Sequence, residues 1–183
     1  MNRLIVLGLG ETVNQYEPQP NDVTFGVNDV FKYHAVQNLL LVNTESCFTK
    51  GDKTRFNTIK NSTPEKFYSI EFATVQWERY FNNIEYVKHF GCYDNDGLRK
   101  ELNIDNDFIY SSMSSPFMAV QLAIKKNPEL KNVYIYGVDF STHKNFTGRR
   151  LDLELICWKW LLKQYRNKGY IFHIPKQSKL SEI

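Results

Sequence analysis

The stretches LIVLGLGET (residues 4–12) and VYIYGVDF (residues 133–140) decide the fold of this chain. Each is a run of aliphatic, β-branched or aromatic residues that stops at glycine and continues into polar side chains. That pattern is typical of a buried strand that breaks into a loop. Because loops at the carboxyl ends of parallel strands line the ligand crevice, we expect both segments to face one shared site that binds a nucleotide-like ligand.

Further strands and helices are predicted on both sides of these segments. Short apolar runs predict strands at residues 23–27, 39–42 and 170–174, and weaker ones at 66–70 and 84–87 with a helix over 74–81 between them. Helical spacing of apolar residues predicts helices from Ser115 to Asn127 and from Arg150 to Gly169. Strands that alternate with helices predict an α/β fold, a three-layer Rossmann-like domain with a mostly parallel central sheet. We expect one nucleotide-binding domain over residues 1–175 and a loose polar tail over 176–183.

Composition narrows the function classes. The chain has 183 residues, of which 42% are hydrophobic and 23% charged, as expected of one globular domain. Its 23 basic and 20 acidic residues are interspersed and give a net charge of +3, so nucleic acid is not an expected partner. The three cysteines, Cys47, Cys92 and Cys157, form no CxxC pair, which indicates free thiols and a cytoplasmic protein. No apolar run has the length of a signal sequence or a membrane span.

The loop after the first strand can contact a ligand through backbone groups rather than through side chains. Gly8 and Gly10 have no β-carbon, so a phosphate or ribose can approach the chain closely at this point, beside Glu11 and Thr12. The third glycine of a dinucleotide fingerprint is missing, and Pro18 and Pro20 argue against the long helix that usually follows. A tight structural turn is the alternative.

Asn28 and Asp29 follow the second strand. An amide that both donates and accepts, next to a carboxylate, can recognise a ribose or the edge of a base. Alternatively, one of the two caps a short helical segment over residues 30–33.

Ser114 and Ser115 precede the helix that Pro116 begins. Their hydroxyls lie at the positive end of that helix, which favours a phosphate or carboxylate. Capping alone explains Ser115, whereas a second hydroxyl at Ser114 is not needed for a cap.

The loop after the late strand carries Gly137, Asp139 and His143. Histidine titrates near neutral pH and aspartate can orient or accept a proton, so Asp139 and His143 are candidates for a general base. A surface position is the alternative for His143. Arg149 and Arg150 could neutralise a diphosphate, or could simply form the solvated start of the helix.

The sequence assigns no metal ligand. Asp94-Asn95-Asp96 has the DxD form of a divalent-metal motif, but Asp-Asn-Asp-Gly is also an ordinary surface turn. No zinc spacing, no Gly-x-Ser-x-Gly elbow and no Gly-Lys-Ser/Thr phosphate loop is present.

The order of these segments resembles that of the single-domain bacterial sialyltransferases and of the related hydroxymethylpterin pyrophosphokinase-like domains. The resemblance covers about the first forty residues and residues 111–147. It implies that Gly8, Gly10, Asn28, Ser114 and Ser115 surround a nucleotide, and that the segment from Gly137 to Phe140 lies close to the same pocket. It further implies transfer from a nucleotide-activated donor without a required metal.

Three functions stay open on the sequence. The leading one is a glycosyltransferase that uses a nucleotide sugar, with a CMP-linked donor such as one carrying sialic acid favoured, and a hydroxyl acceptor. The second is diphosphoryl transfer from ATP, which requires Mg²⁺ and carboxylates such as Asp94, Asp96 and Asp139. The third is a nucleotide-binding or interaction module without catalysis, and an aromatic content of 15% leaves room for self-association into a homo-oligomer.

Overall fold

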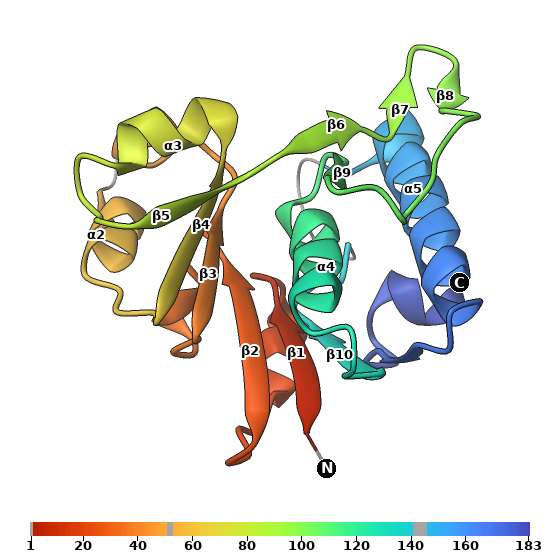
Figure 1. Ribbon diagram of the computed structural model, residues 1–183, viewed down its shortest axis with the longest axis horizontal. Helices are drawn as coiled ribbons and strands as arrows, with labels where there is room; N and C mark the ends of the chain where they lie inside the picture. The colour runs from red at the N-terminus through yellow and green to blue at the C-terminus, as the bar shows by residue number, and fades with distance from the viewer. Residues whose placement is uncertain (1, 51–52, 141–145) are drawn as a thin grey trace.

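The computed structural model describes residues 2–50, 53–140 and 146–183 and is built around one parallel sheet (Figure 1). The order of the seven strands is β11-β10-β1-β2-β3-β4-β5, and every neighbouring pair is parallel. The strands are β1 (Arg3–Leu7), β2 (Asp22–Val27), β3 (Asn38–Leu41), β4 (Lys66–Ile70), β5 (Ile84–Val87), β10 (Asn132–Tyr136) and β11 (Ile171–His173). The predicted α/β class, parallel sheet and Rossmann-like layering are confirmed.

Helices cover both faces of the sheet because its central strands are apolar on both sides. Leu4 and Val6 of β1 pack into one core with α4 (Ser115–Lys126) and α5 (Gly148–Arg166). Ile5 and Leu7 point to the opposite core, which contains residues of η1 (Glu11–Gln15), α1 (Ser46–Thr49), α2 (Thr54–Lys60) and α3 (Glu71–Trp77). This alternation produces the three layers.

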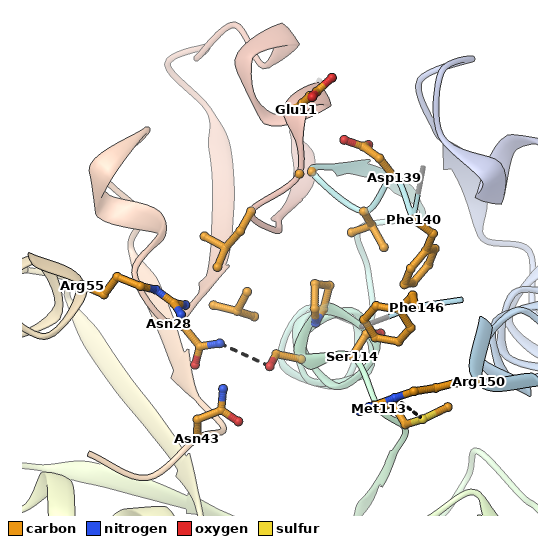
Figure 2. Close-up of a pocket in the computed structure, with 17 residues that line it drawn as sticks. Glu11, Asn28, Asn43, Arg55, Met113, Ser114, Asp139, Phe140, Phe146 and Arg150 are labelled. Carbon is orange, nitrogen blue, oxygen red and sulfur yellow. Dashed lines mark hydrogen bonds between the residues drawn. The ribbon is translucent and has the colours of Figure 1, made fainter. Parts of the chain in front are cut away.

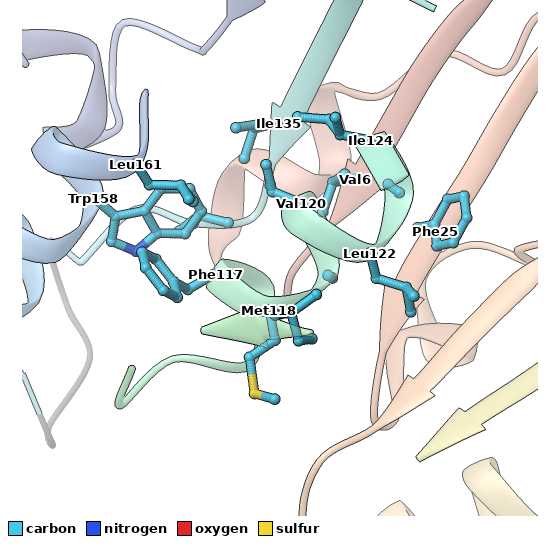
Figure 3. Close-up of a cluster of buried hydrophobic side chains, with 14 of the residues drawn as sticks. Val6, Phe25, Phe117, Met118, Val120, Leu122, Ile124, Ile135, Trp158 and Leu161 are labelled. Atoms are coloured by element: carbon cyan, nitrogen blue, oxygen red, sulfur yellow. The ribbon is translucent and has the colours of Figure 1, made fainter. Parts of the chain in front are cut away.

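The α4 side of the core is dominated by large side chains (Figure 3). Phe117 of α4 and Trp158 of α5 meet edge to face, with ring centroids 5.4 Å apart. Val6 of β1 and Ile135 of the neighbouring β10 lie beneath the same helix. The contact fixes the start of α4 between the sheet and α5.

The middle of the chain contributes to the sheet and adds a small separate layer. β4 and β5 extend the sheet, and α3 lies between them in sequence, at 71–77 rather than at the predicted 74–81. Beyond β5 follow the short strands β6 (His89–Gly91), β7 (Tyr93–Asp94), β8 (Gly97–Leu98) and β9 (Ile109–Ser111). β6 pairs with β9, and β7 with β8. Strands of two or three residues leave no periodic signal in a sequence.

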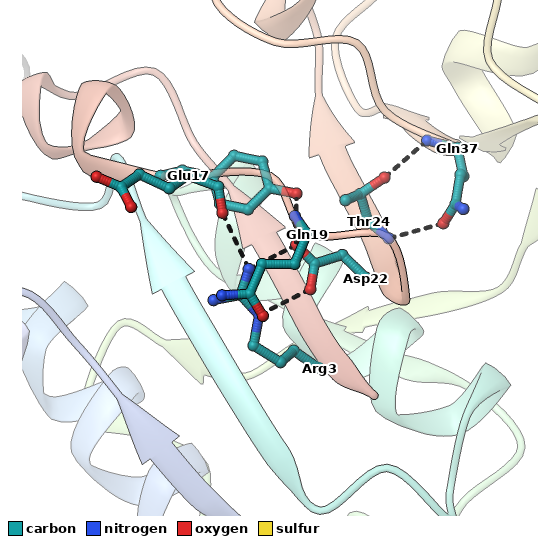
Figure 4. A network of polar contacts seen from close by, with 7 residues as sticks. Arg3, Glu17, Gln19, Asp22, Thr24 and Gln37 are labelled. Atoms are coloured by element: carbon teal, nitrogen blue, oxygen red, sulfur yellow. Dashed lines mark hydrogen bonds and ion pairs between the residues drawn. The ribbon is translucent and has the colours of Figure 1, made fainter. Parts of the chain in front are cut away.

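The amino ends of β1 and β2 are tied by a polar network (Figure 4). Arg3 Nε and Nη2 each donate to the carboxylate of Asp22, both over 2.7 Å. The Tyr16 hydroxyl and the Gln19 amide also donate to Asp22, each over 2.9 Å. Burial would raise the pKa of Asp22, but these partners outweigh it and lower that pKa.

The carboxyl-terminal segment corrects one expectation. The polar composition of residues 176–183 predicts a loose segment, yet Leu180 is 0% exposed in the 3-10 helix η3 (Lys179–Glu182). The Ser178 hydroxyl donates to the carbonyl of Val138 over 2.6 Å, and the Lys179 amide donates to that of Asp139 over 3.1 Å. One buried leucine and two hydrogen bonds thus hold the segment against the loop after β10.

Candidate functional site

A cavity of about 730 Å³ opens at the carboxyl ends of the central strands. After β1 the chain continues to β2 on one side, and it returns later to β10 on the other, so β1 and β10 form the topological switch point where ligands bind in such sheets. Figure 2 shows Asn28, Asn43 and Arg55 on one wall, with Phe140, Phe146 and Arg150 on the opposite wall. The start of α4, with Ser114, lies between the walls.

The glycines of the two strand ends pack against each other. Gly8 N donates to Tyr136 O over 2.8 Å, and Gly10 N donates to Gly137 O over 2.9 Å. A β-carbon at Gly8 would lie 2.2 Å from Gly137 O, and Gly137 itself has φ +70°. Gly10 and Gly137 line the cavity, whereas Gly8 makes a structural close approach behind it.

Asp139 joins the same two loops. One carboxylate oxygen accepts the Thr12 amide over 2.9 Å, and the other accepts the Thr12 hydroxyl. Thr12 Oγ1 in turn accepts the Gly137 amide over 2.8 Å. Thr12 is buried within this network. The preceding residue, Glu11, is exposed and lines the cavity. Both oxygens of Asp139 are therefore engaged in holding η1.

Asn28 has the most informative polar side chain of the cavity. It is 4% exposed, and its backbone is in the left-handed region, at φ +51°. Its Nδ2 donates to Ser115 Oγ over 3.3 Å, while its buried Oδ1 has no hydrogen-bond partner among the described residues. A buried acceptor without a partner costs free energy unless a ligand supplies a donor.

Asp29 lies behind the cavity rather than in its lining. Its carboxylate is fully buried and accepts Arg55 Nε over 2.9 Å and Arg55 Nη2 over 2.6 Å. Asp29 precedes η2 (Val30–Lys32), but its side chain makes no capping bond there. Arg55 lines the cavity from α2 and has no signal in the sequence, because only the fold brings it to Asp29.

The turn before α4 is organised by a residue of α5. The structure places Ser114, not Ser115, at the N-cap position, and the Ser114 hydroxyl makes no capping bond. It donates instead to Glu154, which is 0% exposed. Ser112 Oγ, Met113 N and Trp158 Nε1 also donate to Glu154, over 2.8, 3.0 and 3.0 Å. A carboxylate four residues before Trp158, on the buried stripe of the helix, was the signal for Glu154.

The opposite wall is aromatic and cationic. Phe140 has φ +57°, and its ring meets that of Phe146 at a centroid distance of 5.0 Å. Arg150 lies over the Phe146 ring, and its Nε donates to Met113 Sδ over 3.1 Å. His143, a candidate general base in the sequence analysis, lies outside the described residues.

Several solved structures are similar to this chain over nearly its whole length. The chain is similar to the sialyltransferase CstII from Campylobacter jejuni in complex with the substrate analogue cytidine-5'-monophosphate, at 13% identity and a TM-score of 0.53, over 100% of this chain and 83% of that chain. The CstII complex with CMP-3FNeuAc matches at 11% identity and a TM-score of 0.51, over 100% and 84%. The complex of CST-II with a trisaccharide acceptor and CMP matches at 13% identity and a TM-score of 0.53, over 98% and 84%.

The chain shares its fold with a sialyltransferase. The resemblance to CstII extends through the middle segment, where the sequence motifs gave no match, since nearly the whole chain is aligned. No protein-family model and no curated protein matches the sequence.

The carboxylates considered for a metal do not converge in the described part of the chain. Asp94 and Asp96 belong to the turn between β7 and β8, where Asp96 N donates to Asp94 Oδ1 over 3.0 Å. Neither of them lines the cavity that contains Asp139. Within residues 2–50, 53–140 and 146–183, no three His, Cys, Asp or Glu side chains are grouped so that they could hold a metal ion. None of the helices described here combines the length and the apolar character needed to cross a membrane.

Proposed function

We propose that this protein is a glycosyltransferase that binds a nucleotide sugar in the cavity, with a cytidine nucleotide favoured, and transfers the sugar to a hydroxyl acceptor on a glycan or similar molecule. The fold shared with CstII, a sialyltransferase solved with CMP and with an acceptor trisaccharide, supports the proposal. The observation that carries it within this chain is the buried, unpartnered Oδ1 of Asn28 beside the start of α4.

Two neighbouring features of the cavity, the Asn28 side chain and the start of α4, favour one ligand that carries two kinds of chemical group. The Oδ1 of Asn28 calls for a hydroxyl or amino donor, such as those of a ribose or a nucleobase. The backbone amides and the Ser115 hydroxyl at the start of α4 favour an anion such as a phosphate. The bond from Asn28 Nδ2 to Ser115 Oγ joins the two features directly. A nucleotide carries both groups within one molecule.

The reaction that fits these groups is direct displacement at the anomeric carbon. The bond from that carbon to the phosphate oxygen breaks as the acceptor oxygen attacks, and Ser114, Ser115 and the helix stabilise the leaving phosphate. A base must accept the proton of the acceptor hydroxyl. We assign this role to His143, which lies in sequence between the cavity residues Phe140 and Phe146, because both oxygens of Asp139 are bound by Thr12. The proposal requires no metal ion.

A thermal-shift panel tests the ligand class. The purified protein is titrated with CMP, CDP, UDP, GDP, ADP and ATP, each with Mg²⁺ and with EDTA. A ligand that binds only the folded state at a hundredfold excess over its Kd adds about 2.7 kcal/mol to the apparent stability. We expect a response to CMP in EDTA. A response to ATP only with Mg²⁺ would favour diphosphoryl transfer, and CMP binding without turnover across donors and acceptors would favour a non-catalytic module.

The Asn28→Ala variant tests the observation that carries the proposal. Loss of the amide removes the acceptor for the ligand and the bond to Ser115, so we expect the Kd for CMP to rise about tenfold. Asn83→Ala is the matched control, because Asn83 is the second asparagine with a left-handed backbone among the described residues and lies outside the cavity lining. Equal CMP affinity in both variants would contradict the assignment.

The His143→Ala variant tests the general base. We expect turnover to fall by about 10² to 10⁴-fold while the Kd for CMP stays unchanged. Turnover at the level of the unmodified protein would remove His143 from the mechanism.

A further inference from the structure

Glu154 is a buried carboxylate one layer behind the cavity. It is 0% exposed and lies on α5, yet it accepts hydrogen bonds from three consecutive residues that lead into α4. Trp158 Nε1 supplies the fourth bond, over 3.0 Å. A structural carboxylate needs no contact with the cavity, but one of these partners, Ser114, lines it.

The hydroxyl of Ser114 is fully occupied on its buried side. It donates its one hydrogen to Glu154 Oε1, and its oxygen accepts Trp158 Nε1 over 3.2 Å. A serine hydroxyl has one hydrogen and two lone pairs. While Glu154 is ionised, Ser114 can therefore present only a lone pair to the cavity, and a lone pair repels the oxygen of an anion.

We propose that Glu154 takes up a proton when an anion binds beside Ser114, and that this proton redirects the Ser114 hydroxyl toward the anion. The inference rests on the proposed function, in which a nucleotide phosphate is that anion. The proton comes from solvent and bonds to a carboxylate oxygen of Glu154. The new O–H donates to Ser114 Oγ, whose own O–H bond stays intact and now donates to the phosphate. Glu154 is thus a positioning residue that touches no substrate.

The surroundings of Glu154 favour proton uptake. Burial raises the pKa of Glu154, and the four hydrogen bonds to its charged form offset only part of that shift. Among the described residues, Cys92 and Tyr93, at the start of β7, lie close enough for the charge of Glu154 to raise their pKa values. Arg150 and Cys157 lie about one turn before and after Glu154 on α5. From α4 and the turn before it, the described partners are hydroxyls and an amide only. An arriving anion adds repulsion to the carboxylate and raises its pKa further.

Calorimetry of CMP binding measures the proton directly. Titrations at pH 6 to 9, in pairs of buffers with different ionisation enthalpies, give the number of protons taken up with the ligand. We expect uptake of up to about one proton, and an affinity that falls by up to about tenfold per pH unit as pH rises from the pKa of Glu154 in the free protein to its higher pKa in the complex.

Glu154→Gln isolates this proton from the titration of the phosphate of CMP, which ionises near pH 6. The glutamine amide donates permanently to Ser114, as the protonated carboxyl would, so we expect binding without the Glu154-dependent uptake. Asp152→Asn is the control, because Asp152 is an exposed carboxylate on the same helix. It should keep the full proton uptake.

Ser114→Ala provides a second route should Glu154→Gln fail to fold. Without the hydroxyl there is nothing to redirect, so CMP should bind more weakly and with less proton uptake. CMP binding with the same proton count in the unmodified protein and in the Glu154→Gln or Ser114→Ala variant would overturn this inference and leave the proposed function standing. Absence of CMP binding at every pH would overturn both.

Discussion

Three residues in the left-handed region mark the cavity. Asn28, Gly137 and Phe140 each follow a central strand and have φ between +51° and +70°. Only one of them is glycine, so the other two hold a costly backbone conformation that the surrounding structure must enforce. At Asn28, the backbone N–H donates to Leu40 O over 3.1 Å, and this bond helps to hold the left-handed conformation. This backbone conformation sets the position of the Asn28 side chain.

The close approach of Gly8 to Gly137 gives a stability prediction. A β-carbon at Gly8 would lie 2.2 Å from a backbone oxygen that cannot move without shifting β10. We expect Gly8→Ala to lower the free energy of unfolding by about 2 to 3 kcal/mol, measured by urea denaturation. In Gly91→Ala, the new β-carbon has its nearest neighbour at 3.6 Å, so this control should change stability by no more than about 0.5 kcal/mol. Equal denaturation midpoints would contradict the packing argument.

The ion pair between β1 and β2 acts at the scale of elements, because it fixes the register at the amino ends of two central strands. Arg3 and Asp22 are register partners. Tyr16 and Gln19, which both lie in the connection between β1 and β2, donate to the same carboxylate. The pair therefore anchors the connection as well as the strands.

Asp22→Asn tests this anchor. The amide cannot accept all the donors around it, so we expect the free energy of unfolding to fall by about 2 kcal/mol at pH 7. The pKa of Asp22 is lowered in the folded state, so its contribution is complete at neutral pH and is lost as pH falls from about 4 through that lowered value. Denaturation at pH 7 and pH 3 should show the variant approaching the unmodified protein at the lower pH. A difference that stays constant with pH would argue against the ion pair.

The elements that the sequence predicts well are those whose signal is local. Continuous apolar runs define β1, β2 and β3 because both faces of these strands are buried. The prolines after β1 exclude a long helix, in agreement with the short η1. β6 to β9 are too short for such a signal. In the site, Asn28 and Ser114 follow from their place after a strand or before a helix. Arg55 has no such signal and Glu154 has only its spacing before Trp158, because the roles of both come from tertiary contacts across 26 and 40 residues.

At the scale of the whole molecule, the end of the described chain supports the loop beside the cavity. Leu180 enters the core shared by α4 and α5, and Ser178 and Lys179 bond to the carbonyls of Val138 and Asp139. The polar composition of residues 176–183 did not predict this, because Leu180 is the one fully buried side chain among mostly polar neighbours.

Leu180→Ala measures what this support contributes. Removal of a fully buried leucine side chain should lower the free energy of unfolding by about 3 kcal/mol in chemical denaturation. Ile156→Ala is the control, since Ile156 is 49% exposed on α5 and should cost no more than about 0.5 kcal/mol. Equal losses in the two variants would indicate that the segment is not anchored as described.

The central position of β1 has a consequence for synthesis. Leu4 pairs with Val133, so the ribosome must add about 130 residues before β1 meets its second neighbour. Until then, one edge of the most apolar strand presents unpaired backbone groups to other nascent chains. Such long-range pairing also slows folding, because the closure entropy of a long loop precedes any gain from contact. The arrival of β10 (Asn132–Tyr136) thus decides whether the first strand becomes an interior strand of the sheet or a nucleus for aggregation.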